Sequence, residues 1–82
     1  MGFEASEHAR QMLEERQIPD EWMWRTVTCP ERIETAADGN THFIKSIPEH
    51  GGRLLRVVVN QRVSPYRIVT LFFDRRLLRR QL

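Results

Sequence analysis

The spacing of apolar residues changes once along this chain, at Cys29 and Pro30. Before this point, apolar side chains recur every three or four residues, which is typical of amphipathic helices. After it, short runs rich in β-branched residues alternate with turn residues, which is typical of strands. A helical part followed by a strand-rich part predicts an α+β fold, and 82 residues leave room for one core. We therefore expect a single domain over residues 1–82.

Two helices are predicted in the first part. Ser6 is a favourable N-cap and begins a helix that ends near Arg16. Pro19 disfavours helical geometry in the residue before it and suits the first turn of a helix, so a second helix is predicted from Pro19 to Thr28. Trp24 points away from the apolar stripe of this helix. It either covers the edge of the core or is available to a partner.

The second part predicts a four-stranded antiparallel meander followed by a short C-terminal helix. Asp38-Gly39-Asn40 is a strong hairpin signal, and turn residues at 49–52 and Ser64-Pro65 separate the later strands. Asp74 is a favourable N-cap for a helix over residues 75–81. The predicted strands cover residues 32–37, 41–47, 54–60 and 66–73.

Charge is divided unevenly along the chain. Residues 1–40 carry four basic and nine acidic side chains, a net charge of −5, whereas residues 41–82 carry nine basic and two acidic side chains, a net charge of +7. Twelve of the 13 basic residues are arginine, whose planar guanidinium binds phosphate or carboxylate through two bonds. The second half is a candidate surface for RNA, DNA or an acidic protein. The alternative is that the two halves pair with each other.

The sequence argues against several classes of protein. It has no apolar stretch near the roughly 18 to 20 residues that span a bilayer, and its acidic start is unlike a secretory signal. We expect a cytoplasmic protein without a membrane partner. The one cysteine, Cys29, is expected to be a small buried thiol, and the histidines are not at metal-ligand spacings, so no metal or other cofactor is expected. No P-loop, nucleophile elbow, zinc-protease motif or dinucleotide fingerprint is present.

The remaining residues offer the ingredients of metal-free RNA cleavage, which needs proton-transfer groups and cations that stabilise charge on phosphate. His8 and His42 are the candidate catalytic residues, whereas His50, in a glycine turn, is interpreted as a solvated side chain without function. Tyr66 and Trp24 are candidates for stacking on a base or contacting a partner. The candidate phosphate-binding residues are Arg53, Arg56, Arg67, Arg75 and Arg76.

Each of these candidates has a structural alternative. The spacing of His8, Met12 and Arg16 places all three on one side of the first helix, where His8 either acts on a substrate or packs against the backbone. His42 opens a strand, where a place at the edge of the core is the alternative to catalysis. The basic run over residues 75–80 either contacts phosphate or is a solvated tail.

The segment from His8-Ala9-Arg10 to Met12-Leu13-Glu14-Glu15-Arg16-Gln17-Ile18 resembles the opening of a bacterial family of small domains of unknown function. Val27 and Pro30, followed by residues 52–59 and 66–72, extend the resemblance over about residues 6–73. The order of two helices and four strands is also similar to the BrnT toxins and, more distantly, to the RelE and ParE toxins. This resemblance implies a ribonuclease-toxin scaffold and an antitoxin partner that covers the basic face.

Three hypotheses follow. The first is a metal-free ribonuclease of toxin-antitoxin type, in which His8 or His42 transfers protons and Arg53, Arg56 and Arg67 hold phosphate. The second is a noncatalytic module that uses the arginine-rich sheet face and Trp24 to bind an acidic protein or to form a homodimer. The third is an inactive relative of the toxins.

Overall fold

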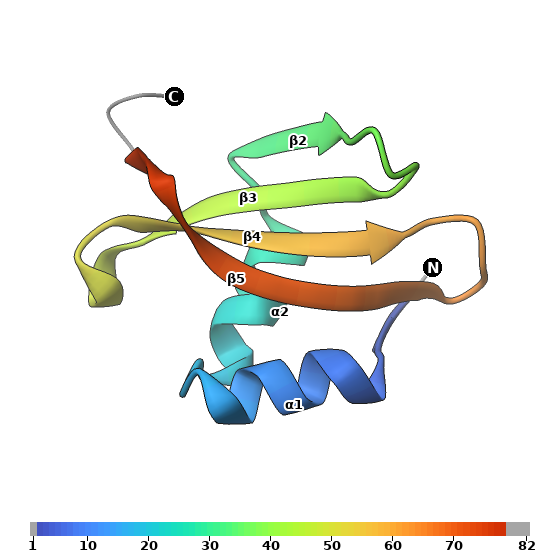
Figure 1. Cartoon of the computed structure of the whole chain (residues 1–82), viewed down its shortest axis with the longest axis horizontal. Coiled ribbons are helices and arrows are strands. Elements are labelled where there is room, and N and C mark those ends of the chain that lie inside the picture. Colours follow the sequence, from blue (N-terminus) through green and yellow to red (C-terminus); the bar gives the residue numbers. More distant parts are fainter. Residues whose placement is uncertain (1, 79–82) are drawn as a thin grey trace.

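The computed structural model describes residues 2–78, with residues 76–78 described by their backbone alone. Two helices pack on one face of a five-stranded sheet (Figure 1). The strand order is β1-β5-β4-β3-β2, with β1 and β5 parallel and the other neighbours antiparallel. In chain order the elements are β1 (Phe3–Ala5), α1 (Glu7–Glu15), α2 (Asp20–Thr28), β2 (Arg32–Thr35), β3 (Thr41–Ile47), the 3-10 turn η1 (Pro48–His50), β4 (Arg53–Asn60) and β5 (Tyr66–Leu78).

The α+β class and the two helices are confirmed, but the predicted four-stranded antiparallel meander is wrong. Phe3–Ala5 forms a fifth strand, parallel to the start of β5, which makes the sheet mixed. Three residues are too few to show an alternating pattern, and their partners lie near the other end of the sequence.

The predicted C-terminal helix is also wrong within the described residues. Residues 75–78 continue β5, because β4 pairs with it as far as Leu78, opposite Arg53. This long-range pairing overrides the local preference of Asp74 for a helix N-cap. Residues 79–81 of the predicted helix lie outside the described residues.

Side-chain and backbone caps set the ends of α1. The Ser6 hydroxyl accepts a 3.0 Å hydrogen bond from the Ala9 amide, as an N-cap should. At the other end, Gln17 adopts a left-handed conformation, and the Ile18 amide donates to the Leu13 carbonyl at 2.8 Å, which is the pattern of a Schellman motif. Both helices have nine residues, and no helix in the described part of the chain is long and apolar enough to cross a membrane.

The core lies between the sheet and the two helices. Leu55, Val57 and Val59 alternate along β4 on the helix-facing side, and each is fully buried. α2 packs across β3 and β4, while α1 lies beside β5. Cys29, which was expected to be buried, is exposed just after α2. The buried core residues are Ala9, Ile18, Met23, Val27, Phe43, Ile47, Leu55, Val57, Val59, Ile68 and Leu71.

Candidate active site

An open groove lies between α1, β5 and the turn that joins β3 to β4. Its volume is about 840 Å³. Within the described residues, β1 pairs with β5 only from Tyr66 to Ile68. The later part of β5 is therefore not paired with β1 and can line this groove. The lining residues are His8, Met12, Arg16, His50, Arg53, Thr70, Phe72, Phe73 and Arg75.

One side of α1 forms a wall of the groove. His8, Met12 and Arg16 follow one another at four-residue intervals and all line it, as their spacing predicts. The Arg16 side chain reaches β5, where Nη1 donates a 3.1 Å hydrogen bond to the Leu71 carbonyl. A guanidinium group has five N–H donors, so this bond orients Arg16 and leaves donors for a ligand.

His50 is held on the opposite wall by two aromatic rings. Its imidazole is tilted by 31° to the Phe73 ring, with 4.3 Å between ring centroids, and lies 5.9 Å from the Trp22 ring. Trp22 and Phe73 meet edge to face at 6.1 Å. Although His50 lies in an exposed turn, these contacts give its ring a defined place beside the groove.

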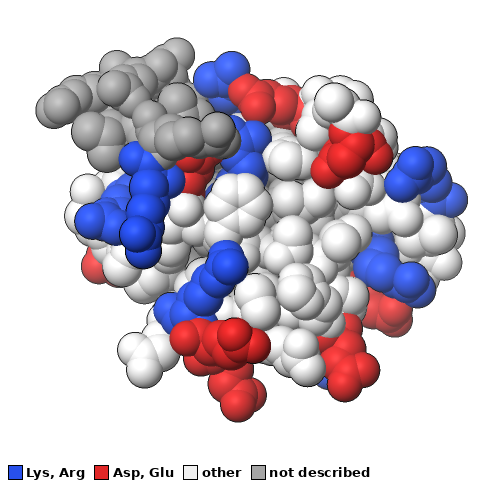
Figure 2. All heavy atoms as spheres, in the orientation of Figure 1, with Lys and Arg blue, Asp and Glu red and all other residues white. Residues whose placement is uncertain are grey.

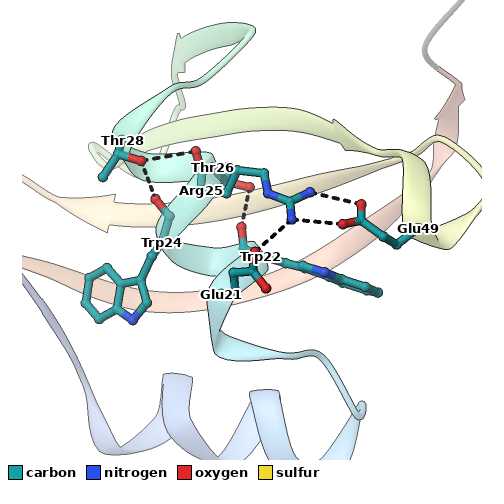
Figure 3. Close-up of polar contacts among 7 residues, drawn as sticks. All are labelled: Glu21, Trp22, Trp24, Arg25, Thr26, Thr28 and Glu49. Carbon is teal, nitrogen blue, oxygen red and sulfur yellow. Dashed lines mark hydrogen bonds and ion pairs between the residues drawn. The ribbon is translucent and has the colours of Figure 1, made fainter.

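The turn that carries His50 is tied to α2 by an ion pair. Arg25 donates two parallel hydrogen bonds to Glu49, each of 2.9 Å, and a third of 3.1 Å to Glu21 on its own helix (Figure 3). The bonds from Arg25 lower the pKa of the Glu49 carboxyl to about 2. The pKa of Arg25 is raised, first by Glu49 and then by Glu21. A bidentate pair of this kind fixes direction as well as distance.

We expect the Glu49 carboxylate to stabilise the fold at neutral pH and to lose this effect in acid. Its pKa is about 2 in the folded chain against an ordinary value of 4.5, so the unfolded chain takes up the proton first as the pH falls. The stabilisation is therefore complete above pH 4.5 and is lost as the pH approaches 2. Urea unfolding of the wild type and Glu49→Gln checks this. The free energies of unfolding of the wild type and Glu49→Gln should differ at neutral pH and become equal as the pH approaches 2. A difference between the two proteins that is constant with pH would contradict the expectation.

Positively charged side chains line the groove. Arg16, Arg53 and Arg75 line it, and none of the described lining residues is acidic. Figure 2 shows basic side chains on two sides of this region, over the β3–β4 turn and above the end of α1, with acidic side chains directly below the latter. Arginines that line one groove favour an anionic ligand, and the fork geometry of the guanidinium group suits phosphate.

His42 and Arg56 lie instead on the sheet face that points away from the helices. Arg56 pairs with Asp74 through Nε and Nη2, at 3.1 and 3.0 Å, and its Nη1 lies 3.1 Å from Glu34. The same Nη1 lies 3.1 Å from Nδ1 of His42. Because a guanidinium only donates, Nδ1 accepts and the His42 proton is on Nε2. The Arg56 side chain is 11% exposed and is engaged in this network, and neither residue lines the groove.

The other predicted site residues are dispersed. Arg67 is exposed on β5, and the Tyr66 ring packs edge-on against Phe3 with 5.6 Å between centroids. Trp24 is 37% exposed on α2 and points away from Glu49 (Figure 3). None of these three candidates lines the groove. The side chain of Arg76 lies outside the described part of the structure.

Of the predicted site residues, the groove thus brings together His8, Arg53 and Arg75. It adds Arg16 and His50, which were not among the predicted site residues. The sequence contains a signal for Arg16, because Arg16 lies eight residues after His8 on a predicted helix and therefore on the same side of it. It contains no such signal for His50, because the position of His50 depends on packing against Phe73, on a strand that is distant in sequence.

The fold and groove define a small α+β domain in which α1, the β3–β4 turn and the mixed sheet present two histidines and three arginines, counted over the described residues, to one groove. The chain belongs to the family described as domain of unknown function DUF4258, whose model matches residues 5–73. Membership of a small family of unknown function was expected over about residues 6–73 and is confirmed. No match was found among curated proteins or among solved structures. Among the described residues that line the groove, only Arg75 lies beyond the matched range.

Proposed function

We propose that this groove cleaves RNA without a metal ion, as a ribonuclease of toxin type. One observation supports this above all: two histidines and three arginines line a single open groove. Imidazole groups can transfer protons near neutral pH, and guanidinium groups stabilise charge on a reacting phosphate. The sequence resemblance to the BrnT and RelE toxins suggests the same class of activity by analogy alone, and β1, which precedes the two helices, departs from the element order on which that resemblance was based.

In the proposed reaction, one of His8 and His50 accepts the proton of a ribose 2′-hydroxyl, and the 2′-oxygen attacks the neighbouring phosphorus. The bond from phosphorus to the 5′-oxygen breaks, and the other histidine donates a proton to that oxygen. Arg16, Arg53 and Arg75 bind the nonbridging oxygens as charge builds on them. The products are one strand with a 2′,3′-cyclic phosphate and one with a 5′-hydroxyl.

This proposal assigns to His50 the role that the sequence suggested for His42. His42 is engaged with Arg56 on the other face of the sheet, whereas His50 shares the groove with His8. The proposal also includes a cytoplasmic location, where a toxin of this type would meet cellular RNA. An acidic antitoxin that covers the groove is the partner that the toxin resemblance implies.

The proposal is tested by incubating the purified protein with a labelled RNA in EDTA and identifying the ends of the fragments. We expect cyclic-phosphate and 5′-hydroxyl ends, and no cleavage of an RNA in which every 2′-hydroxyl is replaced by hydrogen. Cleavage of the deoxy strand would contradict the proposed chemistry. RNA that is bound but remains intact at high protein concentration would identify a noncatalytic binding module.

Arg16 and Arg10 provide a matched pair for the phosphate contact. Both are exposed arginines, but only Arg16 lines the groove. We expect Arg16→Ala to weaken RNA binding and to reduce the slope of log K against log salt by about one, because one phosphate contact is lost. Arg10→Ala should leave that slope unchanged. Fluorescence anisotropy across a salt series measures both, and equal slopes for the two variants would exclude Arg16 from the phosphate site.

A further inference from the structure

The turn that carries His50 has little within itself to hold it in place. It consists of one 3-10 turn, Pro48–His50, followed by Gly51 and Gly52, both with positive φ. Two glycines in succession allow many backbone conformations. Its internal hydrogen bonds, from Gly51 to the Pro48 carbonyl and from Gly52 to the Ile47 carbonyl, close the turn but do not attach it to a helix.

α2 supplies that attachment at two points. Arg25 holds the Glu49 carboxylate through both of its oxygens, and Trp22, three residues earlier, contacts the His50 ring. In Figure 3, Arg25 and Trp22 extend to the same side of α2, toward the turn, while Trp24 points the other way. Glu49 and His50 are adjacent in sequence, so fixing the carboxylate restricts the backbone that carries the imidazole.

We propose that Arg25 is a positioning residue for His50 and acts through Glu49. Arg25 is not among the described residues that line the groove, so its effect on the reaction is indirect. With the ion pair intact, the His50 ring stays stacked on Phe73 and faces the groove; without it, the turn samples other conformations and the imidazole leaves its place for part of the time. This inference rests on the proposed function of His50.

Glu21 provides the control for this ion pair. It also bonds to Arg25, but it lies one turn away on the same helix, so this bond does not join α2 to the η1 turn. Arg25→Ala and Glu49→Ala should each lower kcat for RNA cleavage by about 10- to 100-fold with little change in KM, because misplacing a reacting group by about an ångström has effects of this size. Glu21→Ala should leave both constants unchanged. Arg25→Lys keeps the charge but loses the paired bonds, so its kcat should lie between those of the wild type and Arg25→Ala.

A second measurement reports on His50 without any RNA. In a Trp24→Phe background, Trp22 is the only tryptophan, and a protonated imidazole nearby quenches indole fluorescence. We expect the Trp22 signal to titrate with His50, and the amplitude of this titration to fall in Arg25→Ala and Glu49→Ala but not in Glu21→Ala. His50→Ala should abolish it, which distinguishes His50 from the other charged groups of the groove, His8, Arg16, Arg53 and Arg75, and from those beside the turn, Glu21, Arg25 and Glu49.

The two measurements separate failure of the inference from failure of the proposed function. If Arg25→Ala keeps both the wild-type kcat and the full Trp22 titration, Arg25 does not position His50. If His50→Ala cleaves RNA normally while Arg25→Ala still reduces the Trp22 titration, the ion pair positions His50 but the proposed catalytic role is wrong. A loss of activity in Glu21→Ala equal to that in Arg25→Ala would also overturn the inference.

Discussion

Replacing His50 with alanine is expected to lower kcat/KM for RNA cleavage by about 100- to 10,000-fold, the range that a positioned acid or base contributes. The imidazole lines the groove with His8 and three arginines, and its ring is fixed against Phe73 at 4.3 Å. His8→Ala should have an effect of similar size, since the reaction needs both an acid and a base. Initial rates on a fluorogenic RNA measure the loss.

His50→Phe separates proton transfer from packing. Phenylalanine can keep the stack on Phe73 and the contact with Trp22 but cannot carry a proton, so this variant should be as inactive as His50→Ala. Because His50 is exposed, both variants should unfold at nearly the wild-type urea concentration. If His50→Phe cleaves RNA at the wild-type rate, His50 has a packing role and the catalytic assignment is wrong.

Replacing Asp74 with alanine is expected to destabilise the fold by about 3 kcal/mol, because it leaves a buried guanidinium without its main carboxylate. The Asp74 side chain is 2% exposed and receives bonds from Nε and Nη2 of Arg56. A chain of this length has a total stability of roughly 4 to 12 kcal/mol, so such a loss is a large share of it. Urea unfolding followed by circular dichroism measures the change.

Asp38→Asn is the matched control, since it removes an exposed carboxylate at the margin of the same network while the amide oxygen can still accept the bond from the Asn40 amide. It should change the free energy of unfolding by no more than about 0.5 kcal/mol. Replacing Arg56 and Asp74 together by leucine should cost less than the sum of the single variants, because the pair is then removed as a unit. A loss below about 1 kcal/mol for Asp74→Ala would show that the pair is not the main support of this face.

Local sequence signals predicted those elements whose geometry is set locally. Ser6 does cap the first helix, and Pro19 precedes the second. The Asp38-Gly39-Asn40 turn joins β2 to β3, with the Asn40 amide bonded to the Asp38 carboxylate at 2.9 Å. In each case the determining contacts lie within a few residues, so single-sequence rules apply.

The predictions of secondary structure are wrong where the structure depends on contacts between distant parts of the chain. β1 exists because Phe3–Ala5 pairs with the start of β5, and no local pattern reports this. Asp74 satisfied the rule for a helix N-cap, but its carboxylate is paired with Arg56 on the neighbouring strand, and the strand continues past it. A buried ion pair and a strand ladder together outweigh a local capping preference.

The candidate site shows the same contrast between features set by local sequence and features set by long-range contacts. The positions of His8 and Arg16 could be predicted from helical spacing, because one face of a helix is a local property. The placement of His42 and Arg56 in a network, and of His50 in the groove, depends on strand register and on stacking across the fold. Residue type alone indicated which chemistry is available but not which side chains meet.

The most direct test of the central proposal is the cleavage of one synthetic RNA in EDTA by the wild type and by the His8→Ala/His50→Ala double variant, prepared in parallel. The proposal predicts that the wild type cleaves the RNA and that the folded double variant does not, which also excludes a contaminating ribonuclease. Equal cleavage by both proteins, or intact RNA with the wild type, would contradict it.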